Sequence, residues 1–198
     1  MPSPVGHAIA GLCGYTLVAR DVAPRYRKAL LFASVAIANL PDIDILPGVF
    51  AGDLGRFHRQ GTHSLVAGLA IGLFVGLLVK RWKWSSLQWG VWAFTLYLSH
   101  ILLDMLVESS RGVQFFWPFS DDYFISPITI FRSFKYSASA IGTIQTIFSL
   151  NNTFTVIWEI ILLFPILWLT QSFTGRLRQF KQSLQFRLAY LFDGKQRR

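Results

Sequence analysis

The sequence predicts an all-α fold, a polytopic membrane helical bundle with about five membrane segments and a basic amphipathic C-terminal tail. Of the 198 residues, 53% are hydrophobic and 16% aromatic, while only 15% are charged. This composition is too apolar for a soluble domain of this size. The apolar residues gather in long runs, and basic residues lie between and after them. We therefore expect residues 1–170 to form one membrane-embedded domain, followed by a tail at 171–198.

Five apolar segments make up the expected bundle, at residues 5–19, 29–46, 62–79, 87–107 and 153–170. A membrane-spanning helix needs about 20 mostly apolar residues, and the last three segments fit that length. The first two are short or end in polar residues, so they could tilt, thin the bilayer locally or re-enter without crossing. Gly68, Gly72 and Gly76 in the third segment recur at every fourth position, which is typical of closely packed membrane helices.

The connection 108–152 and the tail are expected at opposite faces of the membrane. The connection contains WPFSDDYFISP and is rich in Phe, Ser and Ile, so we expect an outer loop with interfacial aromatics and a short amphipathic helix. The tail alternates basic residues with Phe and Leu at helical spacing. It is expected to lie on the anionic cytoplasmic leaflet, with a solvated basic tail as the alternative.

Lysine and arginine set the expected orientation, because they are enriched in cytoplasmic loops. If all five segments cross and the linker 20–28 is cytoplasmic, most of the 19 basic residues fall inside and most of the 10 acidic residues fall outside. The net charge of +9 is then a topology signal, and no nucleic-acid partner is expected. The single cysteine, Cys13, rules out a disulfide framework and a Cys-based zinc finger.

On this topology, all four histidines and three aspartates fall at the outer side of the membrane. They are His7, Asp42, Asp44, His58, His63, His100 and Asp104. Asp104 follows His100 by one helical turn, so the two side chains share a helix face. Imidazole and carboxylate groups suit Zn²⁺ and also Mn²⁺ or Fe²⁺, and the lack of thiolates argues against a purely structural zinc. The sequence therefore predicts a divalent-metal site, with zinc as the first choice.

The candidate side chains outnumber what one ion needs, since a catalytic zinc takes three protein ligands and a water. Either two ions bind, or some of the side chains orient the ligands or transfer protons. Arg59 is a candidate clamp for an anionic substrate oxygen, with an ordinary surface arginine as the alternative. Glu159 is expected to be a snorkelling acid or a group behind the ligands, and we do not expect it to bind metal.

The ordered motifs GHAIAG, PDIDI, HRQGTHS, SHILLD and WPFSD resemble the bacterial inner-membrane metal-dependent hydrolases of the YdjM type, some of which are LexA-regulated. The resemblance covers residues 1–125, and HRQGTHS followed by an apolar helix and SHILLD is its most specific part. It implies a metal site formed by His7, Asp42, His58, His63, His100 and Asp104. The family is distantly similar to zinc-dependent phospholipases C, all-helical enzymes with His-x-x-x-Asp ligand pairs.

These observations predict a membrane-bound hydrolase with one or two metal ions and a metal-activated water, at the outer face of the cytoplasmic membrane. The expected substrate is an ester, with a phosphoester first, in a membrane lipid or lipid-linked phosphate that arrives by lateral diffusion. Asp42 or Asp44 could act as general base where it is not a ligand, and Asp44 is the choice consistent with the metal set above.

Two alternatives stay open. A metal-ion transporter would carry polar groups at several depths along a transit path. A membrane scaffold or regulatory protein would hold a purely structural metal. An intramembrane zinc protease is disfavoured, because the chain lacks His-Glu-x-x-His.

Overall fold

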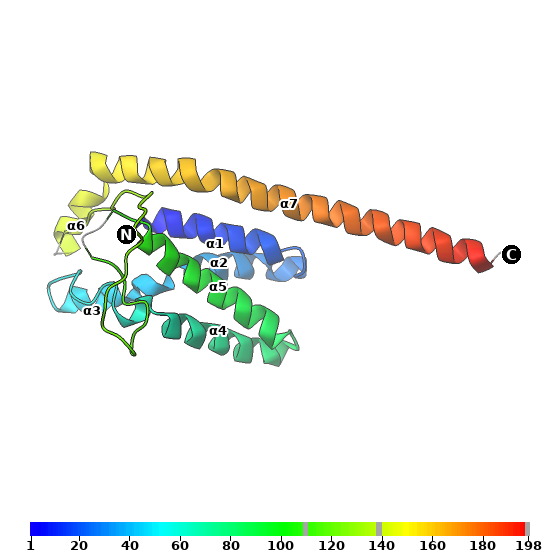
Figure 1. The fold of residues 1–198 in the computed structure, drawn as a ribbon, viewed down its shortest axis with the longest axis horizontal. Coiled ribbons are helices and arrows are strands. Elements are labelled where there is room, and N and C mark those ends of the chain that lie inside the picture. Colours follow the sequence, from blue (N-terminus) through cyan, green and yellow to red (C-terminus); the bar gives the residue numbers. More distant parts are fainter. Residues whose placement is uncertain (109–110, 138–139, 197–198) are drawn as a thin grey trace.

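The structure, a computed structural model, describes residues 1–108, 111–137 and 140–196 (Figure 1). Within them the chain is helical, which confirms the predicted class, and two isolated bridges are the β-type pairings there. The main helices are α1 (Pro4–Val18), α2 (Arg27–Asn39), α4 (Leu65–Val79), α5 (Ser86–Met105) and α7 (Leu150–Gln196). Helix α1 contacts α2, α5 and α7, and α5 contacts α2 and α4, so five helices form one bundle.

Short helical turns connect these helices. They are η1 (Pro24–Tyr26), η2 (Leu40–Asp44), α3 (Ile45–Phe50), η3 (Gly61–His63), η4 (Lys80–Trp82) and α6 (Ala140–Ile147). Figure 1 shows the α1–α2 and α4–α5 turns at one end of the bundle, and the start of α1, α3 and α6 at the other end. The long connection 108–152 thus lies at the end where α1 begins.

Three helical stretches in the described part of the chain are long and apolar enough to cross a membrane: Pro24–Phe50, Leu65–Trp82 and Leu150–Arg176. Helix α1 is a shorter apolar helix. The second predicted segment therefore qualifies, although the sequence ranked it as marginal. Helix α5 was expected to be among the clearest spans and does not qualify, because polar groups such as Ser99, His100 and Asp104 lower its hydropathy. The expected count of about five membrane segments is therefore approximate.

Serine caps fix where the helices that carry the candidate site begin. The Ser3 side chain accepts hydrogen bonds from the second and third backbone N–H groups of α1, with Pro4 at the first helical position. Ser64 caps α4 by accepting from Ala67 N, and Ser85 caps α5 in the same way. As a result, His7 lies in the first turn of α1 and His63 lies just before α4.

Small residues bring the helices into close contact, as the glycine spacing predicts. A Cβ atom on Gly72 would lie 2.9 Å from the backbone oxygen of Gly90 in α5, and one on Gly76 would lie 2.7 Å from Ser86 O. A Cβ on Gly11 of α1 would lie 2.8 Å from Ser34 O in α2. Backbones this close tolerate no larger side chain. The packing fixes α5, with its candidate ligands, against α4.

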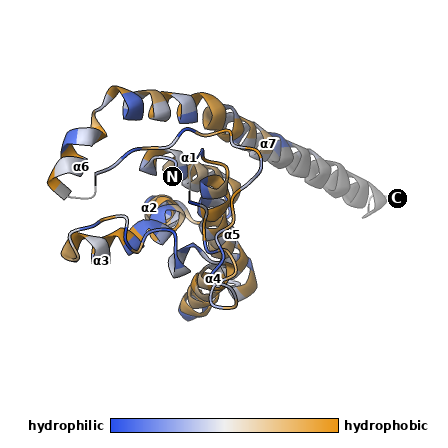
Figure 2. Ribbon diagram, turned by 60° about the vertical axis from the view of Figure 1, so that its left-hand side comes forward, coloured by the Kyte–Doolittle hydropathy of each residue, from blue (hydrophilic) through white to orange (hydrophobic). Residues whose placement is uncertain are grey.

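Figure 2 shows largely hydrophobic helices in the bundle, and many of the apolar side chains face outward. Examples with more than half of their surface exposed are Phe32, Leu73, Phe74, Leu87, Phe164 and Trp168. An exposed apolar surface of this extent is expected for helices in contact with lipid. Helix α7 continues to Gln196, past the predicted segment 153–170. The predicted amphipathic side chains of the tail lie, for the most part, outside the described residues.

Candidate metal centre

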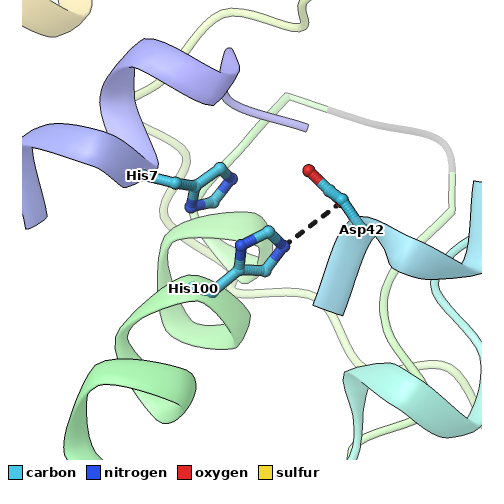
Figure 3. A group of neighbouring side chains, drawn as sticks. All are labelled: His7, Asp42 and His100. Carbon is cyan, nitrogen blue, oxygen red and sulfur yellow. Dashed lines mark ion pairs between the residues drawn. The ribbon is translucent and has the colours of Figure 1, made fainter. Parts of the chain in front are cut away.

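Seven buried or nearly buried polar side chains meet at the end of the bundle where α1 begins. His7 comes from α1, Asp42 and Asp44 from η2, His58 from the loop after α3, His63 from η3, and His100 and Asp104 from α5. The rings of His7 and His100 are stacked with their centroids 3.6 Å apart. Figure 3 shows His7 and His100 side by side with Asp42 facing them. Segments far apart in the sequence therefore build one cluster.

Three overlapping groups in this cluster could each hold a metal ion, with one ligand atom per residue and all three atoms within 4.8 Å of one another. The groups are His7–Asp42–His100, Asp42–His58–His63 and His63–His100–Asp104. Every predicted metal ligand belongs to at least one group, and three of them belong to two. The overlap suits either one ion with several ligands or two ions that share ligands.

Several distances between these atoms are longer than ordinary hydrogen bonds, although His63 Nε2 and His100 Nε2 lie 3.2 Å apart. Asp42 Oδ1 lies 3.4 Å from His100 Nε2, 3.6 Å from His63 Nε2 and 3.8 Å from His58 Nδ1. Asp104 Oδ1 lies 3.5 Å from His7 Nε2. Two ligand atoms that are each about 2.0–2.1 Å from a tetrahedral zinc lie roughly 3.3 Å apart. The spacing therefore fits groups arranged around a cation better than groups bonded to one another.

Acceptors at Nδ1 turn the Nε2 atoms of His63 and His100 toward the cluster, while His58 faces the carboxylates with its Nδ1. Asp44 Oδ1 lies 2.9 Å from His58 Nδ1, and Asp44 Oδ2 lies 3.0 Å from His63 Nδ1. The Ala38 carbonyl lies 2.8 Å from His100 Nδ1 and can only accept, so this nitrogen carries the proton. A proton on Nδ1 leaves the Nε2 lone pair free, which is how metal-binding histidines are usually oriented.

Asp44 is fully engaged in these orienting contacts. Its Oδ2 also accepts hydrogen bonds from the backbone N of Arg59 at 3.0 Å and from Thr62 Oγ1 at 2.7 Å. A carboxylate with both oxygens occupied is poorly placed to accept a proton from water. The geometry therefore favours an orienting role for Asp44, while the predicted general-base role stays a prediction.

Several buried atoms of the cluster have no hydrogen-bond partner among the described residues. They are both ring nitrogens of His7, Asp42 Oδ1, His58 Nε2 and Asp104 Oδ1. Buried polar atoms are nearly always paired, because leaving one without a partner costs about 1–3 kcal/mol. A divalent cation would satisfy these lone pairs at once. The donor set of imidazole and carboxylate, without thiolate, fits Zn²⁺, Mn²⁺ or Fe²⁺.

Arg59 is buried, so the alternative of an ordinary surface arginine is wrong. Its Nε lies 3.0 Å from Asp104 Oδ2, and its Nη1 donates a hydrogen bond to Arg111 O at 2.5 Å. Its backbone has φ 67°, a left-handed conformation that is uncommon outside glycine and often found at functional sites. The predicted role as substrate clamp stays a prediction.

The carboxylates make this part of the protein attractive to positive charge. His63 lies in η3, outside the candidate membrane spans. Burial disfavours its charged form, but the nearby carboxylates of Asp42, Asp44 and Asp104 outweigh burial and raise the pKa of His63 to about 9. The same negative field would attract a divalent cation.

Comparison with known proteins places this chain in a family. The sequence model of the YdjM inner membrane protein family matches residues 1–177. The chain belongs to the YdjM inner membrane protein family. It is also similar to the inner membrane protein YbcI of Escherichia coli (strain K12), with 34% identity over 148 residues, or 72% of this chain and 83% of the relative. No solved structure matches the chain.

The family match has two consequences. It confirms the resemblance found in the sequence and extends it past residue 125 into α7. Together with the helices able to span a membrane, it assigns this YdjM-family chain to the inner membrane. All of the histidines and aspartates described above lie within the matched residues 1–177.

The structure adds residues that sequence analysis of this YdjM-family chain did not single out as part of the centre. Thr62 bonds to Asp44, and Tyr97 Oη donates to the Thr62 carbonyl at 2.6 Å. The ring of Tyr136 lies edge-on to His58, with centroids 6.0 Å apart, and burial raises the pKa of Tyr136. Thr62 could have been suspected from its place beside His63. Nothing in the local sequence marks Tyr136, because it reaches the centre from the long connection.

Glu159 lies behind the centre and does not snorkel, since it is fully buried. Its Oε1 accepts a hydrogen bond from Ser3 N at 2.6 Å, and its other oxygen accepts from Ser3 Oγ. Glu159 thereby joins α7 to the N-terminal end of α1, the helix that carries His7. It belongs to none of the three candidate groups found among the described residues.

Proposed function

We propose that this YdjM-family protein is a membrane-bound, metal-dependent hydrolase that cleaves an ester, with a phosphoester or phospholipid-like substrate favoured, at the outer face of the inner membrane. One observation carries the proposal. Buried atoms of His7, Asp42, His58 and Asp104 have no hydrogen-bond partner among the described residues, while Asp44 and the Ala38 carbonyl hold the rings of His63 and His100 with Nε2 toward the cluster.

The residues that would hold the metal are His7, Asp42, His58, His63, His100 and Asp104. A bound divalent ion such as Zn²⁺ supplies a water of pKa about 7 and polarises the ester oxygen. Asp44 keeps the Nδ1 protons of His58 and His63 in place. Arg59 Nε lies 3.0 Å from Asp104 Oδ2 and brings a positive charge to the cluster, so we assign it the binding of a phosphoester oxygen.

The outward orientation rests on the distribution of charge. The α1–α2 and α4–α5 turns carry Arg20, Arg25, Arg27 and Lys28, and Lys80, Arg81 and Lys83. These turns lie at the end of the bundle opposite the cluster (Figure 1). Basic residues favour the cytoplasmic side. A site at the other end would therefore face the outside, at the depth of the lipid headgroups.

A metal transporter is less well supported. Transport would need metal-binding groups at several depths along a path through the bundle. The candidate metal-binding groups in the described part of the chain instead gather at one end. Uptake of labelled Zn²⁺ into sealed vesicles by the purified protein would nevertheless support a transporter over a hydrolase.

Two experiments on the full-length protein purified in detergent test the proposal. The first is metal analysis, and the second is a hydrolysis assay with p-nitrophenyl phosphate and with phospholipid vesicles. We expect zinc or another divalent metal to co-purify, and hydrolysis to stop with a chelator and return when metal is added. Protein without bound metal, or hydrolysis that a chelator leaves unchanged, would contradict the proposal.

A further inference from the structure

An apolar cavity of about 550 Å³ adjoins the metal centre. Its wall is formed by α3, the segment around Tyr136, α6, the first turns of α7 and the start of the chain, and includes Ile45, Leu54, Ile147 and Val156. The volume lies within the range of about 300–1,000 Å³ that is typical of ligand pockets. Such a cavity offers dispersion contacts and almost no hydrogen bonds, so its occupant must be apolar.

The cavity and the metal centre share parts of the chain. Ile45 in the wall directly follows Asp44. Tyr136 in the wall faces the ring of His58, and Ser3 in the wall caps the helix that carries His7. A molecule whose apolar part fills the cavity would therefore have its other end beside the centre.

Asn152 holds the wall of the cavity in place. It is buried at the start of α7, where its Oδ1 accepts from Lys135 N at 2.8 Å and its Nδ2 donates to Lys135 O at 2.7 Å. These two bonds fix the backbone next to Tyr136 against α7. The cavity is thus a built feature of the fold, since a buried amide with all of these partners defines one position of the segment.

The surroundings indicate where an apolar occupant comes from. The part of α7 that lines the cavity belongs to the candidate membrane span Leu150–Arg176. Close to it in sequence, Phe148 and Phe154 are exposed, and Phe50 at the end of α3 is 91% exposed. Side chains like these are stable in lipid and unfavourable in water. A molecule that enters the cavity therefore comes from the bilayer.

We propose that the cavity binds an acyl chain of a glycerophospholipid, so that the phosphate of the same molecule lies at the metal centre. This inference rests on the proposed hydrolase function, which it makes more specific: the substrate is an intact bilayer lipid held by its tail. Lys135, exposed and directly before Tyr136, adds a positive charge on the same segment that suits an anionic headgroup.

The test uses full-length protein in vesicles of phosphatidylethanolamine and phosphatidylglycerol, with a phosphatidylglycerol that carries a photoreactive diazirine at the end of one acyl chain. Val156→Trp fills the cavity with an indole, and Ile147→Trp fills it from α6. Val75→Trp is the matched control, because Val75 is also partly buried and lines a separate apolar cavity of about 430 Å³ beside Trp84 and Trp89.

We expect cross-links on the peptides that line the cavity to fall roughly tenfold in Val156→Trp and Ile147→Trp, because the indole takes the space of the acyl chain. Val75→Trp should label like the unsubstituted protein, and bound zinc should be the same in all variants that keep the fold. Unchanged labelling in both cavity-filling variants would overturn the inference.

Hydrolysis in the same samples separates this inference from the proposed function. Loss of lipid hydrolysis in Val156→Trp, with p-nitrophenyl phosphate hydrolysis unchanged, supports both. Cavity labelling that Val156→Trp abolishes, without any chelator-sensitive hydrolysis, supports lipid binding and contradicts the hydrolase.

Discussion

Asp44 orients His58 and His63 together: its two oxygens lie 2.9 Å and 3.0 Å from the Nδ1 atoms of the two rings. One carboxylate therefore determines the direction of two candidate metal-binding nitrogens. The pair of histidines comes from a loop and a short turn, elements that could otherwise adopt many arrangements. Asp44 thus gives these segments the rigidity that a metal site needs.

Replacing Asp44 with asparagine separates an orienting role from a catalytic one. Asparagine can accept from one imidazole at most, since its Nδ2 is a donor. If Asp44 orients the ligands, Asp44→Asn should weaken metal affinity by about 10–100-fold, the usual effect of losing such a partner. Zinc titration with a competing chelator measures this. Unchanged affinity with lost hydrolysis would instead identify Asp44 as a general base. Asp53→Asn, an exposed aspartate in the neighbouring loop, is the control.

Loss of a single ligand should remove bound metal while the protein still inserts. We expect His63→Ala and Asp104→Ala each to lose most of the metal, because both residues contribute to a buried group of three ligands. Metal content by mass spectrometry, on protein recovered from membranes, checks the result. Glu108→Ala is the matched control, since Glu108 is an exposed carboxylate four residues after Asp104, past the end of α5. Full metal content in both ligand variants would show that the assigned residues are not ligands.

Any two of the three candidate groups share one residue, so two ions could bind at once through a shared ligand. We therefore expect close to two zinc ions per chain in the purified protein. Asp42 belongs to two of the three groups, so Asp42→Ala should reduce the content to one ion or fewer. Elemental and amino-acid analysis gives the ratio of zinc to protein, which shows how many ions each chain binds. A ratio of one that persists in Asp42→Ala would exclude Asp42 as a shared ligand.

Arg59 and Asp104 form a buried ion pair that should stabilise the fold even in the metal-free protein. Removing one member leaves the other charge buried and unpaired, which typically costs about 3–5 kcal/mol. Arg59→Ala should therefore lower the free energy of unfolding of the metal-free protein by about that amount, measured in detergent by tryptophan fluorescence. Arg56→Ala, which removes an exposed arginine from the same loop, should change stability little. Equal stabilities for the two variants would contradict the importance of the pair.

Glu159 should stabilise the docking of α7 on α1. Glu159→Ala leaves Ser3 N and Ser3 Oγ without their buried acceptor, a loss of about 1–3 kcal/mol. Glu159→Gln still offers an acceptor and should cost less. Unfolding in detergent compares the two. If the alanine variant is no less stable than the glutamine variant, these hydrogen bonds do not hold the helices together.

Sequence analysis predicted the membrane bundle and the candidate cluster well. The apolar segments are long, and charge placement alone put His7, His63 and His100 at the same end, where the structure also brings them together. The spacing of His100 and Asp104 fixed their common face, because helix geometry is regular. Features that follow from regular patterns along the sequence could therefore be predicted without a structure.

Features that depend on contacts between distant segments could not be predicted from the sequence. The sequence could not show that Asp44 bonds two histidines or that Arg59 is buried against Asp104, because both contacts join segments whose relative position is set by helix packing. Helix α5, which the sequence placed among the clearest spans, is less apolar than the three candidate spans for a related reason. Its polar groups face the interior of the bundle, where they serve the cluster, and the same groups reduce its hydropathy.

The hydrogen bonds between Ser3 and Glu159 also determine when the fold can be completed during synthesis. The two residues are 156 positions apart, so the first helix receives its anchor only after the final membrane helix has left the ribosome. Until then we expect His7 to be poorly held and the nascent chain to bind metal weakly. A chain truncated before α7 would thus lack the contact that holds the first helix, so the candidate metal centre would form only once α7 has packed on α1.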